Sequence, residues 1–408
     1  MISFYFSLKK DLLILSEWRK KLFTILLLSG IYFSNGGALA ANCQVSDWPM
    51  WRQFNQHFVD ANGRVIDAST KQLKSTSEGQ SYAMFFSLVA NDPIAFEKLW
   101  RWSMRHLFAG PLDSHLPAWI WGLSADGQWR VLDTNSASDA NLWFIYALLE
   151  AGRVWNRPDY TRDAMKLLHQ VELQEVAILP GLGKMLLPGP VGFSKPDQLW
   201  QLNPSYLPIP LLRRFAQVSP TGPWTEIALT TVEMVTAVSP QGFVADWVGY
   251  QAKVNTRAGF VVDALKGDVG SYDAIRVYLW AGMMPKGDPL SRQMLQSLGG
   301  MLSATHAAGV PPEMVHVLSG STSGKGSFGF SAALLPYFRA MGQTKLLDSQ
   351  SQRVRNLHAQ SLLPSNMSTQ LPTYYDHVLS LFGTGWIDNR YRFQVNGQVK
   401  FLWETTCS

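Results

Sequence analysis

The stretch Ser77-Glu78-Gly79-Gln80-Ser81-Tyr82 decides the fold, because it places one carboxylate in a small-residue turn directly before the apolar run 83–90. Ser77 is the expected N-cap of a helix, with Gln80 three residues later in the position of a capping box. A helix that is apolar on nearly every face is expected to be buried all round. The turn therefore either only starts a helix or presents Glu78 at the rim of a buried helix, where burial raises the pKa of a carboxyl as a general acid requires.

The same pattern of a polar turn followed by an apolar helix recurs five more times. The later turns begin near residues 136, 203, 271, 327 and 372. Most of the apolar helices are followed by an amphipathic segment, at 93–107, 158–175, 223–238, 288–307 and 344–361. Six hairpins of inner and outer helix fit an all-α fold, an (α/α)6 barrel, and an open α-solenoid is the main alternative. Strand signals are short, as at 129–132 and 391–395, and are expected to form hairpins in loops.

The first forty residues have the pattern of a cleaved export signal. Arg19-Lys20-Lys21 precede an apolar run from Leu22 to Phe33, and Ala38-Leu39-Ala40 is a small-x-small cleavage site. The run is short for a membrane span, and a retained anchor is the alternative. We expect residues 41–408 to form a single domain, because no linker divides them, and to be periplasmic or secreted.

The charge of the chain does not indicate a nucleic-acid partner. The 408 residues include 35 Lys/Arg and 30 Asp/Glu, but five of the basic and two of the acidic residues lie in the expected signal. The mature chain would therefore carry a net charge of only about +2. Sixteen Trp exceed what a core of this size usually holds, so some of these rings are expected to line a surface groove.

Carboxylates are the remaining candidates for chemistry once metal and nucleotide motifs are excluded. The eight His are scattered, the Gly-rich stretch 320–329 lacks the P-loop spacing, and neither a metal nor another cofactor is expected. Glu78, Asp139 and Asp273 each open an inner helix, where capping alone could explain any one of them. In a closed barrel they would meet at one rim beside aromatic loops that contain Trp119, Trp121, Trp200, Tyr206 and Tyr272. Such a cleft suits cleavage of a neutral glycan, in which one acid protonates the leaving oxygen and one base activates water.

Several long motifs resemble glycoside hydrolase family 8. They are SEGQSYAMFF, ASDANLWFIYALLEAGRVW, NPSYL and SYDAIRVYLW, supported by LPAWIWG, LPGLGKMLLPG and GFSAALLPYF. The resemblance covers essentially residues 43–407 and is strongest to a subgroup, the periplasmic endo-β-1,4-glucanases encoded with bacterial cellulose synthase. It implies an (α/α)6 barrel and inverting, endo-acting hydrolysis of β-1,4-glucosidic bonds in cellulose. It also implies a role in bacterial cellulose synthesis and export.

The resemblance assigns roles to individual residues. Glu78 would be the general acid and Asp273 the general base, oriented by Arg276 one helical turn later. Asp139 would hold the sugar on the non-reducing side of the cut. Further sugar contacts would come from Trp121, Tyr206, Trp200, Tyr374 and Tyr272.

Two departures from the family pattern and several alternatives stay open. Asn141 stands where the family usually has Asp, which leaves the strength of sugar binding there open, and Ala83 stands where close relatives often have Gly. The substrate could be chitosan or xylan instead of cellulose. The protein could be a non-catalytic glycan-binding scaffold of an export complex, against which the presence of both Glu78 and Asp273 argues. An epimerase or lyase is disfavoured, since no His lies in the turn motifs. The expected partners are a cellulose chain and, through the resemblance, the cellulose synthase complex, with the protein itself a monomer.

Cys43 and Cys407 are the two cysteines of the chain and lie at opposite ends of the expected mature domain. In an oxidising compartment they would form a disulfide that ties the ends together, and the alternative is two free thiols on frayed ends. We predict the disulfide, which the chain-entropy model values at about 4–6 kcal/mol because the closed loop is so long. Mass spectrometry of non-reduced peptides from exported protein should find the two cysteines linked, and two free thiols would contradict this.

Overall fold

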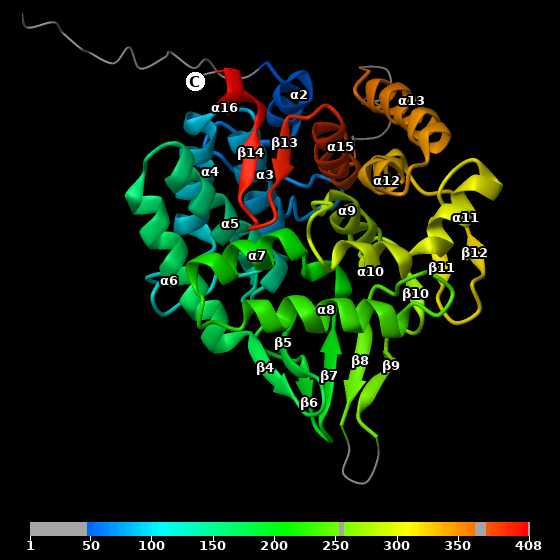
Figure 1. The fold of residues 1–408 in the computed structure, drawn as a ribbon. Helices are drawn as coiled ribbons and strands as arrows, with labels where there is room; N and C mark the ends of the chain where they lie inside the picture. Colours follow the sequence, from blue (N-terminus) through cyan, green and yellow to red (C-terminus); the bar gives the residue numbers. More distant parts are fainter. Residues whose placement is uncertain (1–46, 253–256, 364–372, 407–408) are drawn as a thin grey trace, which may run out of the picture. The chain divides into compact units, whose positions relative to one another are not determined.

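Six helices that are apolar on most faces form a closed inner ring in the computed structural model, which describes residues 47–252, 257–363 and 373–406 (Figure 1). They are α3 (Ser77–Val89), α5 (Ser138–Val154), α7 (Ile209–Val218), α9 (Ile275–Met283), α12 (Phe328–Ala340) and α15 (Tyr374–Ile387). Consecutive members pack on each other. The ring closes between the first and the last, where the ring centroids of Phe86 and Phe382 lie 4.6 Å apart. This closure confirms the predicted (α/α)6 barrel and excludes the open solenoid.

The outer layer combines five helices that follow inner helices with one from the start of the chain. The five are α4 (Pro93–His106), α6 (Pro158–Gln174), α8 (Trp224–Val238), the pair α10 (Ser291–Gln296) and α11 (Gly299–Ala308), and α13 (Thr344–Ser361). The sixth position is filled by α2 (Pro49–Phe58), which packs on α15 through Phe54 and Tyr374. Sequence analysis did not assign α2, although its buried residues Trp51, Phe54 and Phe58 follow the spacing of a helix with one buried face.

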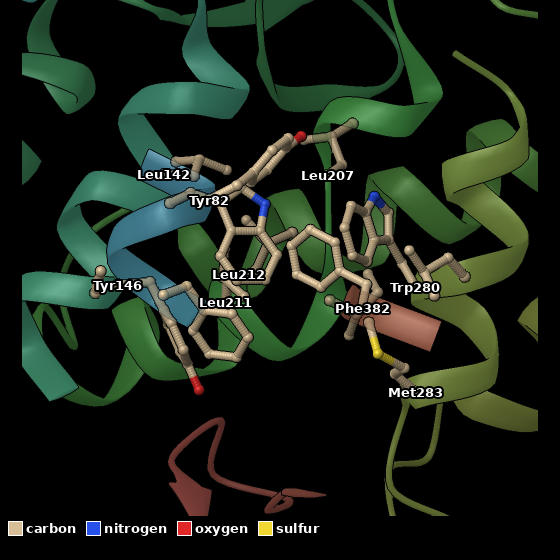
Figure 2. Close-up of a cluster of buried hydrophobic side chains, with 14 of the residues drawn as sticks. Tyr82, Leu142, Tyr146, Leu207, Leu211, Leu212, Trp280, Met283 and Phe382 are labelled. Carbon is tan, nitrogen blue, oxygen red and sulfur yellow. The ribbon is translucent and has the colours of Figure 1, made fainter. Parts of the chain in front are cut away.

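Side chains from several inner helices meet on the axis of the ring. Figure 2 shows this cluster, which includes Tyr82 of α3, Leu142 of α5, Leu211 of α7, Trp280 of α9 and Phe382 of α15. Each of these side chains is at most 3% exposed. Removal of such large apolar surfaces from water is the main favourable contribution to folding. The candidate site described below therefore stands on a rigid, dry support.

The start of α3 differs from the predicted capping box. The N-cap is Thr76, whose hydroxyl accepts the N–H of Gly79 at 3.1 Å, so Ser77 is already the first helical residue. Gln80 is fully buried, its Oε1 accepts the N–H of Val65 at 2.6 Å, and its Nε2 donates to nearby backbone carbonyls. The Gln80 amide thus connects α3 to neighbouring segments and does not reach back to the N-cap.

Short antiparallel strands occupy the loops. The two predicted hairpins are confirmed as β2 (Ile120–Leu123) with β3 (Trp129–Asp133), and β13 (Tyr391–Phe393) with β14 (Val399–Phe401). β1 (Ser75–Thr76) adds to β2. The sheets that were not predicted are β4 (Val176–Leu179) with β5 (Gly183–Leu186), β6 (Ser194–Lys195) with β7 (Leu199–Leu202), β8 (Val248–Gln251) and β9 (Gly259–Val262), and β10 (Val269–Gly270) with β11 (Met314–His316) and β12 (Thr322–Ser323).

The end of the barrel at which the inner helices finish is covered by the β13–β14 hairpin and α16 (Leu402–Thr406), drawn in red in Figure 1. The hydroxyl of Tyr146 donates to the carbonyl of Gly397 at 2.8 Å, and Arg153 pairs with Glu404 at 3.1 Å. Within the described segments, no helix has the length and apolar character that crossing a bilayer requires. The expected signal at 1–40 and both cysteines, Cys43 and Cys407, lie outside the described residues.

Gly383 of α15 lies at a close approach to α12, where an added Cβ would overlap the carbonyl of Ala332. We predict that Gly383→Ala lowers the free energy of unfolding by at least about 2 kcal/mol, because the two inner helices would have to separate. Gly299→Ala in α11 is the matched control, since nothing lies within 4 Å of its added Cβ. The control should change stability by less than about 1 kcal/mol. Urea unfolding followed by circular dichroism measures both, and equal effects would contradict the prediction.

Candidate active site

The turns at which α3, α5, α7 and α9 begin line a cavity of about 470 Å³. Glu78 reaches it from the first turn of α3, Asp273 from the turn before α9, and Arg276 from α9 itself. Aromatic walls come from Trp119, Tyr206, Phe193 and Trp247. Within residues 47–252, 257–363 and 373–406, no group of three or more His, Cys, Asp or Glu side chains is arranged to hold a metal ion. The cavity presents three carboxyl groups, Glu78, Asp133 and Asp273, together with aromatic faces to a ligand.

Glu78 is a partly buried carboxyl with two hydrogen-bond donors. The indole Nε1 of Trp119 donates to its Oε1 at 3.0 Å, and the hydroxyl of Ser77 donates to its Oε2 at 3.3 Å. Burial raises the pKa of Glu78, and this effect exceeds the opposing effects of the two donors and of the positive charge on Arg276. Glu78 therefore keeps its proton to a higher pH than a free glutamic acid, as a general acid must.

Asp273 accepts a hydrogen bond on each of its carboxylate oxygens. The guanidinium of Arg276 donates to Oδ1 at 2.9 Å, and the amide of Asn203 donates to Oδ2 at 3.2 Å. Asn203 is itself fixed, because its side-chain oxygen caps the 3₁₀ turn η1 (Pro204–Tyr206). These two donors, one of them a charged guanidinium, hold the carboxylate in one orientation.

The backbone turn that carries Asp273 is held by a second carboxylate, Asp246. One oxygen of Asp246, Oδ1, accepts the N–H groups of Ser271 at 2.8 Å, Asp273 at 3.1 Å and Ala274 at 2.7 Å. Burial, and then the charge on Asp273, raise the pKa of Asp246. Sequence analysis missed this residue, because Asp246 lies in a loop between α8 and β8 and its partners follow 25 or more positions later.

Asp139 lies behind the cavity lining. Its side chain is 2% exposed, its Oδ1 accepts the N–H of Ala140 at 2.8 Å, and its Oδ2 lies 3.9 Å from the guanidinium of Arg276. In the described part of the chain Oδ2 has no hydrogen-bond partner. Burial, and then the negative charge of Glu78, raise the pKa of Asp139 well above its usual range. Arg276 thus stands between the three carboxyl groups that sequence analysis placed at one rim.

The aromatic residues expected in the cleft divide into those inside and those outside the cavity lining. Tyr206 lies inside, edge-on to Trp247 with ring centroids 6.2 Å apart. Trp247 in turn stacks parallel to Phe193 at 6.0 Å, and sequence analysis had singled out neither of these two rings. Tyr272 lies outside the lining, with its hydroxyl donating to Glu313 at 2.8 Å.

Trp121 is outside the lining as well, whereas its neighbour Trp119 is inside. Residues two apart in a regular strand face the same side, but the register of β2 against β3 shifts between Ile120 and Trp121. Trp121 stacks instead on Trp129 at 5.1 Å and meets Trp102 of α4 edge-on at 5.5 Å. Trp121 is therefore not part of the lining of this cavity, and its role as a sugar contact stays a prediction.

Trp200 and Tyr374 also lie away from the cavity lining. Trp200 on β7 packs against Tyr250 at 6.3 Å. The ring of Tyr374 packs against Phe54 and Phe58 of α2, which explains its position at the junction of α15 and α2. The family resemblance implied both residues as sugar contacts, and that role stays a prediction; in the structure their rings pack against neighbouring aromatic rings.

The fold and this cavity define a closed ring of helix hairpins with carboxyl groups at an aromatic rim, and known proteins are similar to this chain in sequence and in fold. The chain matches the family model "Glycosyl hydrolases family 8" over residues 21–389. It is 49% identical to an endoglucanase of Pseudomonas fluorescens (strain SBW25), with 90% of this chain and 94% of that protein covered. It is 41% identical to an endoglucanase of Escherichia coli (strain K12), with 88% and 93% covered.

Among solved structures, the endo-1,4-D-glucanase from Vibrio fischeri ES114 superposes with a TM-score of 0.82 at 38% identity, over 88% of this chain and 100% of that one. The chain therefore belongs to glycoside hydrolase family 8, which confirms the resemblance noted from the motifs. It is a glycoside hydrolase, related over most of its length to endoglucanases.

The hydrogen bond from Trp119 to Glu78 gives a prediction for the pH profile. The indole N–H stabilises the ionised carboxyl, so Trp119→Phe should raise the pKa of Glu78 further. With Glu78 as the general acid, the alkaline limb of kcat/KM for glycan hydrolysis should move to higher pH. Trp121→Phe is the matched control, because that indole lies outside the cavity lining. The alkaline limb of the kcat/KM profile of this control should stay at the pH found for the unsubstituted enzyme. Equal shifts in both variants would contradict the prediction.

Proposed function

We propose that the protein hydrolyses internal β-1,4-glucosidic bonds of cellulose with inversion, with Glu78 as general acid and Asp273 as general base. The observation that carries this proposal is the unlike environment of two carboxyl groups on one cavity. Burial favours the protonated form of Glu78, whereas Arg276 and Asn203 both donate to Asp273. A buried carboxyl that keeps its proton and a second carboxylate held in place by hydrogen bonds on the same cavity are the arrangement that acid–base hydrolysis of a glycoside needs.

In this mechanism the glucan lies along the aromatic walls formed by Tyr206 and Trp247. Glu78 donates its proton to the glycosidic oxygen as the bond from that oxygen to the anomeric carbon breaks. Asp273 accepts a proton from a water molecule that attacks the anomeric carbon from the opposite face of the ring. Arg276 keeps Asp273 oriented throughout, and its buried charge limits the repulsion between the carboxyl groups.

The choice of cellulose over chitosan or xylan rests on the relatives and on charge. The relatives at 49% and 41% identity are named endoglucanases. The cavity lining combines the acidic residues Glu78, Asp133 and Asp273 with the basic residues Lys266 and Arg276. This near balance provides no concentrated negative charge that would select a cationic polymer.

We further propose that the protein works in the periplasm or outside the cell, in support of cellulose synthesis and export. The support is the signal pattern in residues 1–40 and the likeness of the motifs to endoglucanases encoded with bacterial cellulose synthase. An oxidising location also suits a disulfide between Cys43 and Cys407. The peptide mass spectrometry described for that disulfide tests this location too.

The acid–base assignment predicts strong losses from two conservative changes. Glu78→Gln and Asp273→Asn should each lower kcat by about 10²–10⁴-fold on carboxymethylcellulose, because neither variant can transfer the required proton. Cellopentaose binding, measured by calorimetry, should persist since the shape of the cavity hardly changes. Glu313→Gln is the control and should keep its activity, because the carboxylate of Glu313 accepts from the hydroxyl of Tyr272 outside the cavity lining, and the carbonyl that accepts from Ser271 belongs to the backbone, which the change leaves in place.

The same experiment tests stereochemistry and substrate. Proton NMR of the first products from a β-1,4-glucan should show the α-anomer before mutarotation, as inversion requires. A reducing-sugar assay should show carboxymethylcellulose cleaved in preference to chitosan and xylan. A β-anomer formed first, or a Glu78→Gln enzyme with nearly normal turnover, would overturn the proposed mechanism. Faster cleavage of chitosan or xylan would overturn the proposed substrate.

A further inference from the structure

Behind the wall of the cavity lies a buried carboxyl group that the proposed mechanism does not use. Glu175 follows the last residue of α6, and its side chain is 0% exposed. The ion pairs within the described segments do not include Glu175. A buried glutamate that lacks a cation is costly as a carboxylate, so its retention calls for a physical explanation.

Glu175 instead contacts a side-chain amide on the neighbouring inner helix. The Nδ2 atom of Asn141 on α5 lies 2.9 Å and 3.0 Å from the two carboxyl oxygens of Glu175. The same Nδ2 atom lies 2.8 Å from the hydroxyl of Ser136. Asn141 is 0% exposed, so it faces Glu175 behind the wall rather than the sugar-binding space where the family pattern had placed it.

The cluster of Glu175, Asn141 and Ser136 contacts the wall of the cavity at two points. Ser136 and Pro188 both line the cavity that contains Glu78 and Asp273. The backbone N–H of Ser138 donates to the carbonyl of Pro188 at 2.9 Å. The backbone carbonyl of Glu175 accepts the N–H of Leu187, which precedes Pro188, at 2.7 Å. Glu175 thus contacts both segments that form this side of the wall, one through its side chain and one through its backbone.

We propose that Glu175 is a positioning residue for glycan binding and hydrolysis, acting through Asn141 and Ser136 to hold the turn at residues 135–139 in its binding shape. This inference rests on the proposed function, and Glu175 itself does not touch the glycan. The turn supplies Ser136 to the wall and begins α5, whose first turn contains Asp139. A shift of this turn would therefore move both the wall and the carboxyl group next to Arg276.

The shape of the turn should depend on the proton of Glu175. The pKa of Glu175 is raised to about 8, because burial, aided by the negative charge of Asp139, outweighs the hydrogen bonds from Asn141 and Ser136 that lower it. Asp139 on α5 is the charged group that acts on Glu175. Below pH 8 the network is neutral and compatible with burial. Above pH 8 a carboxylate without a paired cation forms behind the wall, and the turn has to rearrange or admit water.

The test measures glycan binding against pH with hydrolysis switched off. In Glu78→Gln protein, cellopentaose binding is followed by calorimetry from pH 6 to 9.5, so that ionisation of the proposed acid plays no part. If only the protonated state binds, the Kd should rise about tenfold between pH 7 and pH 9. The double variant Glu78→Gln/Glu175→Gln keeps a neutral side chain at all these pH values. Its Kd should change less than about twofold over the same range.

Two further variants separate positioning from mere stability. Glu172 lies on α6, and its carboxylate accepts from the indole of Trp224, away from the cavity. The double variant Glu78→Gln/Glu172→Gln should therefore show the same tenfold rise in Kd between pH 7 and pH 9 as Glu78→Gln alone. Asn141→Asp places two carboxyl groups in contact and should weaken binding at pH 7 by about tenfold or more. Adding Glu175→Gln to Asn141→Asp restores one carboxyl and one amide in the pair, and should recover most of that affinity.

Each outcome decides for or against the inference. A flat affinity in Glu78→Gln protein between pH 7 and pH 9 would overturn it, whether or not the position 175 variant folds. An unchanged rise in the Glu175→Gln double variant would also overturn it and assign the titration to another group, with Asp139 first. If the unsubstituted enzyme did not hydrolyse cellulose, the proposed function would be contradicted instead. That result comes from the activity assay, so it is distinguishable from a failure in the binding measurements.

Discussion

Arg276 is the buried cation on which the candidate site depends. Its side chain is 9% exposed, donates to Asp273 and Ser205, and lies 3.9 Å from Asp139. A buried guanidinium without carboxylates would cost several kcal/mol of stability, and carboxyl groups gathered at one rim would repel each other without a cation. The cation and the carboxyl groups therefore need each other. The negative charge of Glu78 also raises the pKa of Asp139, so a pH profile reports on these two carboxyl groups together and not on one residue alone.

The architecture could be predicted from the sequence because its main determinant is local and repeated. A helix that is apolar on nearly every face has to be covered by other helices, and six of them, most followed by an amphipathic helix, fit a closed ring. The same logic places the start of each inner helix at one end, which is why Glu78 and Asp273 reach a common cavity although 195 positions separate them in the numbering. Family resemblance added proposed roles to these positions.

What could not be predicted depends on contacts between distant segments or on the register of strands. Trp119 and Trp121 look equivalent in sequence, and only the irregular pairing of β2 with β3 sends one indole to the cavity and the other to α4. Asp246 and Glu175 carry no local signal, because each acts on a turn that is formed elsewhere in the chain. The helix α2 has the correct spacing of apolar residues, but its partner α15 is more than 300 residues away.

The hairpin that covers the far end of the barrel has a consequence for the order of folding. In this hairpin the carbonyl of Gly397 accepts a hydrogen bond from the hydroxyl of Tyr146. The segment also packs against α3, where the indole of Trp403 donates to the carbonyl of Leu88 at 2.8 Å. The earliest inner helices thus complete their contacts only with the last part of the domain. A nascent chain cannot bury its first helices fully until this segment has left the ribosome. The domain therefore reaches its native structure after its translation is complete and not stepwise during translation. Until then the apolar faces of the first inner helices are exposed and are natural targets for chaperones.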